Sequence, residues 1–138
     1  MFFESIDVLI IGRKTYKKIL SFSNWAYGKK LVIVLSCINI IIPQHLAKTV
    51  SYSAETPTEL CERLAFQGAK RLYVDGGIAI QRFIIDGLIN DFSITVITVI
   101  LGSGIPLFEY LKNYVPLKHL ETKNYDFGFV KSSYEVFK

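Results

Sequence analysis

The sequence has few of the residues from which metal centres and covalent catalytic sites are built. Cys37 and Cys61 are isolated from each other, and so are His45 and His119. No CxxC, HExxH or GxSxG spacing occurs. These absences argue against a structural zinc, a cysteine nucleophile and serine hydrolase chemistry, and we expect no bound metal. Two isolated thiols are typical of a reducing compartment, so we expect a cytoplasmic protein.

The chain also lacks a long hydrophobic run, although 51% of its residues are hydrophobic. Its longest apolar stretch, Ile94–Leu101, is far shorter than the roughly 20 residues that a membrane-spanning helix needs, and threonines interrupt it. This stretch is more typical of a buried strand. Residues 1–5 contain no cationic region ahead of an apolar stretch, so no signal peptide is expected. We therefore predict no membrane partner.

The excess of positive charge is small and scattered. Sixteen Lys and Arg face twelve Asp and Glu, which gives a net charge of +4. The cation pairs Lys17-Lys18, Lys29-Lys30 and Lys70-Arg71 are spread along the chain rather than gathered in one block. A nucleic-acid partner is therefore not expected. Ordinary solubility explains the charge, and attraction of a polyphosphate ligand remains the alternative.

The 138 residues fit one domain, 1–138, in which strands and helices alternate. The clearest helix begins at the capping box Thr56-Pro57-Thr58-Glu59 and ends at Gly68. This order predicts an α/β three-layer sandwich, with a mainly parallel sheet and an antiparallel C-terminal edge. The expected strands are Asp7–Ile11, Leu31–Leu35, Val50–Ser53, Arg71–Val74 and Asp91–Leu101, then the pair Leu117–Lys123 and Gly128–Phe137; the other helices are Thr15–Ser21 and Ile78–Ile85.

Three of the expected strands end in residues suited to a phosphate-rich ligand. Gly12-Arg13-Lys14-Thr15 follows the first strand, Ser36 follows the second, and Gly76-Gly77 lies between a strand and a helix. Ligands of parallel sheets bind beyond the carboxyl ends of the strands. A helix N-terminus and an arginine fork both attract anions, and glycine allows close approach to the backbone. The sequence therefore predicts an anion site at this edge.

Each of these motifs also has a purely structural interpretation. The tetrapeptide Gly12–Thr15 fits a helix start with surface cations equally well, and Ser36 fits a loop serine. Gly76-Gly77 fits a tight turn with positive φ. Asp75 either contacts a polar ligand group or caps the following helix. Gly102-Ser103-Gly104 is interpreted as a turn, because no long helix follows it.

Several segments together resemble the dihydrofolate reductase superfamily, and more closely its RibD C-terminal domain-like branch. The resemblance covers nearly the whole chain. Family members begin with another strand, a mobile loop and usually a helix; the resemblance starts with Phe2 and Phe3 as the end of that helix, so a domain that is short at its N-terminus is expected. The segments are, in order, VLIIGRKTY, VIVLS, LYVDGGIAIQRFI, LINDFSITVITVILGSGIPLF and GFVKSSYEV.

The resemblance implies an enzyme, an NADPH-dependent reductase that transfers hydride to a pterin or a ribosylaminopyrimidine-like heterocycle, as in riboflavin biosynthesis. It also implies homodimers, and a cis peptide at the glycine pair. It identifies no catalytic residue. Because the first segment carries part of the family's substrate pocket, the alternative is a non-catalytic paralogue with weak dinucleotide binding. The implied cofactor-binding residues are Gly12, Arg13, Lys14, Thr15, Leu35, Ser36, Gly76, Gly77, Ile78, Ala79 and Ile80.

Overall fold

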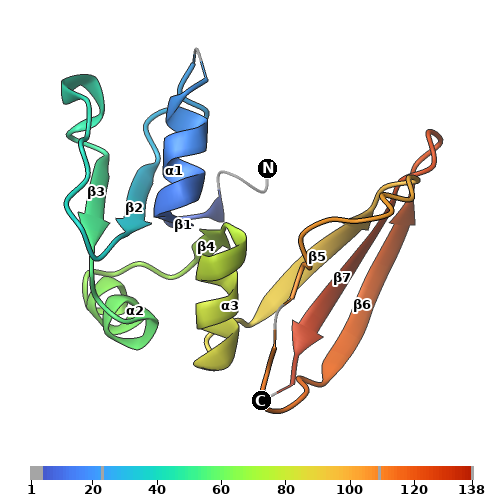
Figure 1. The fold of residues 1–138 in the computed structure, drawn as a ribbon. Helices are drawn as coiled ribbons and strands as arrows, with labels where there is room; N and C mark the ends of the chain where they lie inside the picture. Colours follow the sequence, from blue (N-terminus) through green and yellow to red (C-terminus); the bar gives the residue numbers. More distant parts are fainter. Residues whose placement is uncertain (1–4, 23, 109, 138) are drawn as a thin grey trace. The chain divides into compact units, whose positions relative to one another are not determined.

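The structure, a computed structural model, describes residues 5–22, 24–108 and 110–137. Phe2 and Phe3, expected to end a helix, lie outside the described residues. Internal contacts divide the chain into two compact units, Met1–Asp86 and Gly87–Lys138. The first unit holds a parallel sheet with its helices, and the second holds an antiparallel sheet (Figure 1).

The sheet of the first unit has the strand order β3-β2-β1-β4, and every neighbouring pair is parallel. Both central strands are apolar, which is typical of parallel strands covered on both faces. Because β3 (VSYS) is partly polar, it fits its position at the edge of the sheet. The strands are β1 (Val8–Gly12), β2 (Leu31–Leu35), β3 (Val50–Ser53) and β4 (Leu72–Asp75).

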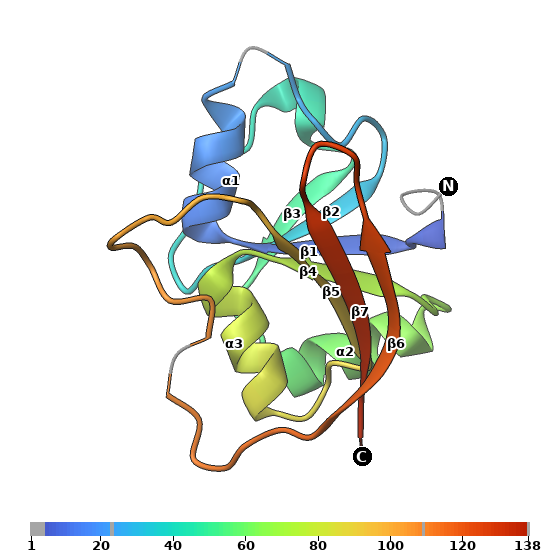
Figure 2. The ribbon, with the colours of Figure 1, turned by 90° about the vertical axis from the view of Figure 1, so that its right-hand side faces the viewer.

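Helices cover both faces of this sheet. In Figure 2, α1 (Arg13–Leu20) lies above β1, whereas α2 (Pro57–Phe66) and α3 (Gly77–Ile85) lie below it. Connections between parallel strands are right-handed, so the direction of the connection decides which face its helix covers. The connection from β1 to β2 runs in one direction along the sheet and the connection from β3 to β4 runs in the other, which places α1 and α2 on opposite faces. A short 3-10 turn, η2 (Gln44–Leu46), precedes β3.

The core is centred on β1 and β2. Leu9 and Ile11 of β1 pack with Tyr16 of α1 in one buried cluster. The alternate residues Val8 and Ile10 are buried as well, so both faces of β1 are covered. The Tyr16 hydroxyl donates a hydrogen bond of 3.0 Å to the carbonyl oxygen of Ile41, which ties the loop before η2 to the core.

Both signals predicted for the ends of α2 are confirmed. The backbone N–H of Glu59 donates to Thr56 Oγ1, and the Thr56 N–H donates to Glu59 Oε1, each at 3.2 Å. At the other end, Gly68 has φ +94° and the Ala69 N–H donates to the carbonyl oxygen of Leu64. These contacts satisfy orphan backbone groups at each end of the helix.

The second unit is a three-stranded sheet of order β5-β7-β6, antiparallel throughout. Its strands are β5 (Asp91–Val96), β6 (Leu117–Asn124) and β7 (Val130–Val136). The predicted closing pair is therefore confirmed as β6 and β7. Among the described residues, β5 bonds only to β7 and β4 bonds only to β1, so the antiparallel strands form a separate sheet rather than an edge of the parallel one.

The predicted strand Asp91–Leu101 is too long. The ladder ends at the pair formed by Val96 and Val130, because the partner strand begins there and the hairpin turn precedes it. Beyond this point, the Val99 N–H donates to the carbonyl oxygen of Ile97 at 2.7 Å, and this tight turn ends the extended conformation.

None of the helices in the described ranges has the length and the apolar composition of a membrane span.

Candidate anion-binding site

The predicted strand ends lie side by side at the carboxyl edge of the first unit's sheet. In the parallel register, Gly12 is the partner of Leu35, and Ile11 is the partner of Asp75. Ser36 is the next residue after β2, and Gly76 is the next residue after β4. The Ser36 N–H also donates to the carbonyl oxygen of Ser53 at the end of β3. The fold therefore brings the three predicted motifs together at one edge.

Two of these motifs meet where Gly76 lies beside the start of α1. The φ of Gly76 is +95°, and a Cβ added there would lie 2.6 Å from Thr15 Oγ1 and 3.7 Å from the Gly12 nitrogen. The backbone of Gly76 thus packs directly against the start of α1. A Cβ added to Gly77 or Gly12 would meet no other atom within 4 Å. The positive φ predicted for a turn is found at Gly76, and all described peptide bonds are trans, so the implied cis peptide is not found.

The two helices that begin at this edge have no side-chain caps. Gly12 is the N-cap of α1 and Gly76 is the N-cap of α3, and neither helix has an acidic residue in its first turn. By contrast, α2 has a complete capping box. The first N–H groups of a helix have no intrahelical partner, and the helix dipole makes that end positive. Two uncapped N-termini beside each other favour a bound anion.

Two cations stand at the first turn of α1. Arg13 is half-buried and Lys14 is exposed. Within the described part of the chain, neither side chain forms a hydrogen bond or an ion pair. The Arg13 guanidinium is therefore available to a phosphate, which it is suited to bind with two parallel hydrogen bonds.

The remaining predicted residues differ in how far their side chains are exposed to solvent. Leu35, Ser36 and Ala79 are buried. The Ser36 hydroxyl donates to the carbonyl oxygen of Ile38 at 2.6 Å and accepts from its N–H, so it belongs to a local turn. Ile80 is half-buried, and Ile78 is exposed beside the N-terminus of α3.

Asp75 has neighbours that sequence reasoning missed. Its Oδ1 accepts a hydrogen bond of 2.8 Å from the Gly76 N–H, and its side chain does not cap α3. Burial, followed by the Asp75 carboxylate and a hydrogen bond to it, raises the pKa of Tyr27 to about 12. Burial and the same carboxylate also raise the pKa of Tyr73. No local signal relates Tyr27 to Asp75, because they come from a loop and a distant strand.

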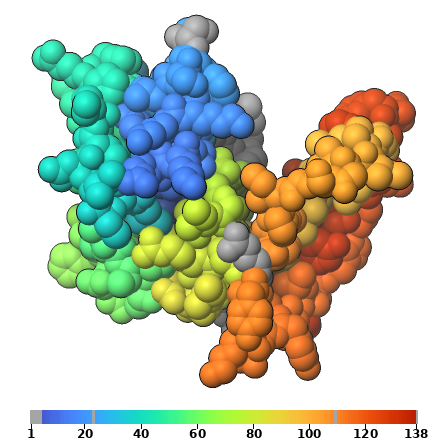
Figure 3. All heavy atoms as spheres, in the orientation of Figure 1, coloured from blue at the N-terminus to red at the C-terminus, as the bar shows by residue number. Residues whose placement is uncertain are grey.

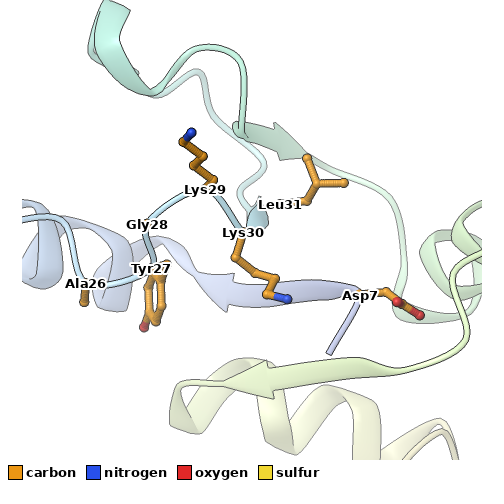
Figure 4. Close-up of a pocket in the computed structure, with 7 residues that line it drawn as sticks. All are labelled: Asp7, Ala26, Tyr27, Gly28, Lys29, Lys30 and Leu31. Carbon is orange, nitrogen blue, oxygen red and sulfur yellow. The ribbon is translucent and has the colours of Figure 1, made fainter. Parts of the chain in front are cut away.

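One cavity of the first unit lies away from this edge. It has a volume of about 610 Å³ and is open, and it lies along β1 toward the amino ends of the strands, where Asp7 precedes β1 and Leu31 begins β2 (Figure 4). Lys30 extends beside β1 and donates to the carbonyl oxygen of Ile6 at 2.6 Å. None of the lining residues belongs to the predicted anion site. They are Asp7, Ala26, Tyr27, Gly28, Lys29, Lys30 and Leu31.

Among the described residues, no three His, Cys, Asp or Glu side chains are grouped to hold a metal ion.

No protein-family model matches the chain. It is 30% identical over 127 residues to the uncharacterized protein YwjB of Bacillus subtilis (strain 168), a match that covers 90% of this chain and 71% of YwjB.

The chain is also similar to solved structures. A putative riboflavin biosynthesis protein from Shewanella sp. PV-4 is 30% identical, with a TM-score of 0.92, and the match covers 99% of this chain and 77% of that one. A Thermotoga maritima protein described as a diaminohydroxyphosphoribosylaminopyrimidine deaminase/5-amino-6-(5-phosphoribosylamino)uracil reductase has the same fold. Its TM-score is 0.72 at 10% identity, and the match covers 96% of this chain and 46% of that one. The chain therefore belongs to the RibD C-terminal domain-like branch of the dihydrofolate reductase superfamily.

Proposed function

We propose that this protein is an NADPH-dependent reductase, which binds the phosphates of the cofactor at the carboxyl edge of β2, β1 and β4. One observation carries the proposal. Two uncapped helix N-termini, a glycine between them and Arg13, which has no partner among the described residues, meet at a single edge of the sheet. Each of these features favours an anion, and together they fit a ligand with several phosphates.

The residues at this edge fit NADPH in three respects. Gly76 and Gly77 present backbone without a side chain, so that a pyrophosphate is able to approach the N-terminus of α3. The first turn of α1 offers its free N–H groups and the Thr15 hydroxyl. Arg13 is suited to the ribose phosphate that distinguishes NADPH from NADH, because a guanidinium binds phosphate with two hydrogen bonds.

When bound, NADPH supplies a hydride. The chain's own residues would hold the cofactor by its phosphates and fix its position along the strand ends. Leu35 and Ser36 provide the backbone that would lie beside the adenosine. The proposed substrate is a pterin or a ribosylaminopyrimidine-like heterocycle, and the names of the Shewanella and Thermotoga relatives favour the second, as a step of riboflavin biosynthesis.

Two measurements on the purified intact chain test this proposal. Titration with NADPH and with NADH, followed by calorimetry, tests binding, and we expect NADPH to bind more tightly. The loss of nicotinamide absorbance in the presence of dihydrofolate or of a ribosylaminopyrimidine tests turnover. Oxidation that depends on one of these substrates is the expected result.

The possible outcomes separate the two functions. Binding of NADPH without oxidation by either substrate supports the non-catalytic paralogue that keeps the fold and binds a dinucleotide. Folded protein that binds neither nucleotide contradicts both functions.

A further inference from the structure

Two cation pairs that are far apart in the sequence lie at the same edge of the first unit's sheet. Lys29-Lys30 precedes β2 and Lys70-Arg71 precedes β4, and these two strands lie on either side of β1. Because the three strands are parallel, their amino ends meet at what we call the amino edge, opposite the candidate anion-binding site. The topology therefore gathers cations that the sequence keeps apart.

Asp7, which precedes β1, lies between the two pairs. The register joins the first residue of β1 to the first residues of both β2 and β4, so Lys30 and Arg71 flank Asp7. The Asp7 N–H donates to the carbonyl oxygen of Arg71 at 2.8 Å, which extends the ladder by one residue. Since neighbouring strands are about 4.8 Å apart, the backbones of Lys30 and Arg71 are roughly 10 Å apart, with Asp7 between them.

The negative charge of Asp7 is already engaged. Its Oδ2 accepts hydrogen bonds from the backbone N–H groups of Lys70 and Arg71, at 2.7 and 2.9 Å. These bonds and, after them, the charges of Lys30 and Lys70 lower the pKa of the Asp7 carboxyl. With Lys29, four cations face this one carboxylate, so the amino edge keeps an excess of three positive charges.

The two outer lysines of this group are available to a ligand. Lys29 and Lys70 are exposed, and in the part of the chain that the structure describes neither side chain forms a hydrogen bond or an ion pair. Lys30, by contrast, is anchored to the carbonyl oxygen of Ile6 at 2.6 Å. An anion at this edge would therefore meet two ammonium groups that break no described bond in order to bind it.

The open cavity along β1 gives such a ligand its place. Its volume of about 610 Å³ lies within the roughly 300–1,000 Å³ of small-molecule sites. Asp7, Lys29 and Lys30 are among the residues that line it (Figure 4). A concave surface with an excess of one sign of charge concentrates counter-ions. The compact grouping favours a small anion over a nucleic acid, which needs a longer stripe of cations.

We propose that the amino edge binds a small molecule with several anionic groups, phosphates or carboxylates, at a site separate from the carboxyl edge. The excess of three positive charges favours a multivalent ligand over a single anionic group. From Asp7 to Gly12 the chain extends roughly 16 Å along β1, so one small anion does not contact both edges. This proposal does not depend on the proposed reductase activity.

Nuclear magnetic resonance titrations of the intact, isotope-labelled chain with pyrophosphate and with citrate test this site. Pyrophosphate represents the phosphates and citrate the carboxylates, so the tighter ligand identifies the class. We expect saturable shifts of the backbone amides of residues 29–31 and 70–71. Shifts of residues 12–15 and 76–77 report the candidate cofactor site separately, so the failure of either proposal is distinguishable from the failure of the other.

The double variant Lys29→Ala/Lys70→Ala should weaken binding at the amino edge roughly tenfold, because it removes two exposed charges that each contribute about threefold. The matched control, Lys17→Ala/Lys18→Ala, removes the same charge from α1, which is drawn in blue at the molecular surface in Figure 3. This control should bind like the wild type. If the double variant fails to fold, Lys29→Ala alone should still weaken binding about threefold.

Asp7→Asn should have the opposite effect. It removes the negative charge and keeps a side-chain oxygen for the backbone N–H groups, so it should strengthen binding about threefold. The proposal is overturned if neither probe gives saturable shifts at the amino edge. It is also overturned if the lysine variants bind as tightly as their control, or if folded Asp7→Asn binds more weakly than the wild type.

Discussion

Thr15 and Gly76 are in contact across the carboxyl edge of the sheet. Thr15 lies in the first turn of α1, after β1, and Gly76 precedes α3, after β4. A side chain at Gly76 would occupy the position next to Thr15 Oγ1, at 2.6 Å, and φ is +95° there. The close approach of β1 and β4 at this edge therefore depends on glycine at this one position.

Gly76→Ala should lower the free energy of unfolding by about 1–3 kcal/mol, because alanine rarely adopts this backbone conformation and its Cβ displaces Thr15. Chemical denaturation monitored by circular dichroism measures the loss. Gly77→Ala is the matched control, since a Cβ there meets nothing within 4 Å and φ is not positive.

The Thr15→Ala background separates the two causes of this loss. Without Oγ1, the steric part of the Gly76→Ala cost should disappear and the backbone part should remain. An equal cost in both backgrounds would mean that contact with Thr15 contributes nothing.

Tyr27→Phe should alter stability at alkaline pH. The folded protein holds the Tyr27 proton up to a pKa of about 12, whereas the ordinary pKa of a tyrosine is 10.0. Between these values the unfolded chain ionises first, so stability falls as pH rises. Removing the hydroxyl should make this decline shallower and should cost about 1 kcal/mol at neutral pH through the lost hydrogen bond.

Denaturation curves between pH 8 and about 12 measure the effect. Tyr114→Phe, at an exposed position, is the control and should leave the decline unchanged. Tyr16 and Tyr73 also have raised pKa values, so part of the decline should persist in Tyr27→Phe. A slope identical to the wild type would show that Tyr27 keeps an ordinary pKa.

Asp7→Asn should change the response to acid. Asp7 Oδ2 accepts hydrogen bonds from the backbone N–H groups of Lys70 and Arg71, at 2.7 and 2.9 Å. These two bonds lower the pKa of the carboxyl below 3.8. The ionised Asp7 carboxyl therefore contributes its full stabilisation above the pKa that it has in the unfolded chain. This contribution is lost as pH falls through the lower pKa that it has in the folded protein.

The variant should be less stable than the wild type at neutral pH, and the difference should shrink in acid. Thermal unfolding at pH 7 and near pH 3 provides the comparison. Glu62→Gln removes an exposed carboxylate of α2 and serves as the control. A difference that stays constant with pH would contradict the role given to the Asp7 charge.

Thr56→Ala should cost about 1 kcal/mol, because it removes the side-chain half of the capping box. Thr58→Ala, two residues further along the same first turn, lacks a capping contact and should be close to neutral. The difference in their melting temperatures isolates the cap. Equal melting temperatures would contradict the reciprocal bonds between Thr56 and Glu59.

Local sequence signals predicted most of the secondary structure. Leu31–Leu35 and Val50–Ser53 were predicted with the bounds that the structure has, because apolar runs and breaking residues delimit them. The fold class followed from the alternation of such elements, and the location of three motifs at strand ends led to the edge where they meet. These inferences need only periodicity, caps and turns.

What failed or was missed depends on contacts between distant residues. The strand predicted to reach Leu101 ends at Val96 because its partner β7 begins at Val130, and no local pattern contains that limit. The proximity of Tyr27 to Asp75 and of Thr15 to Gly76 arises from packing and register. Likewise, the hydroxyl of Ser36 is taken up by Ile38, which residue type alone does not indicate.

Calorimetric titration of NADPH into the wild type, Arg13→Ala and Lys17→Ala tests the central claim most directly. Both variants remove one cation from α1, but Arg13 stands at the uncapped N-terminus and Lys17 lies one turn along, in its last turn. Bonds between charged groups contribute about 1.5–3 kcal/mol, so Arg13→Ala should weaken binding roughly 10- to 100-fold while Lys17→Ala changes it little. A folded wild type without NADPH affinity, or two variants that bind alike, would contradict the account.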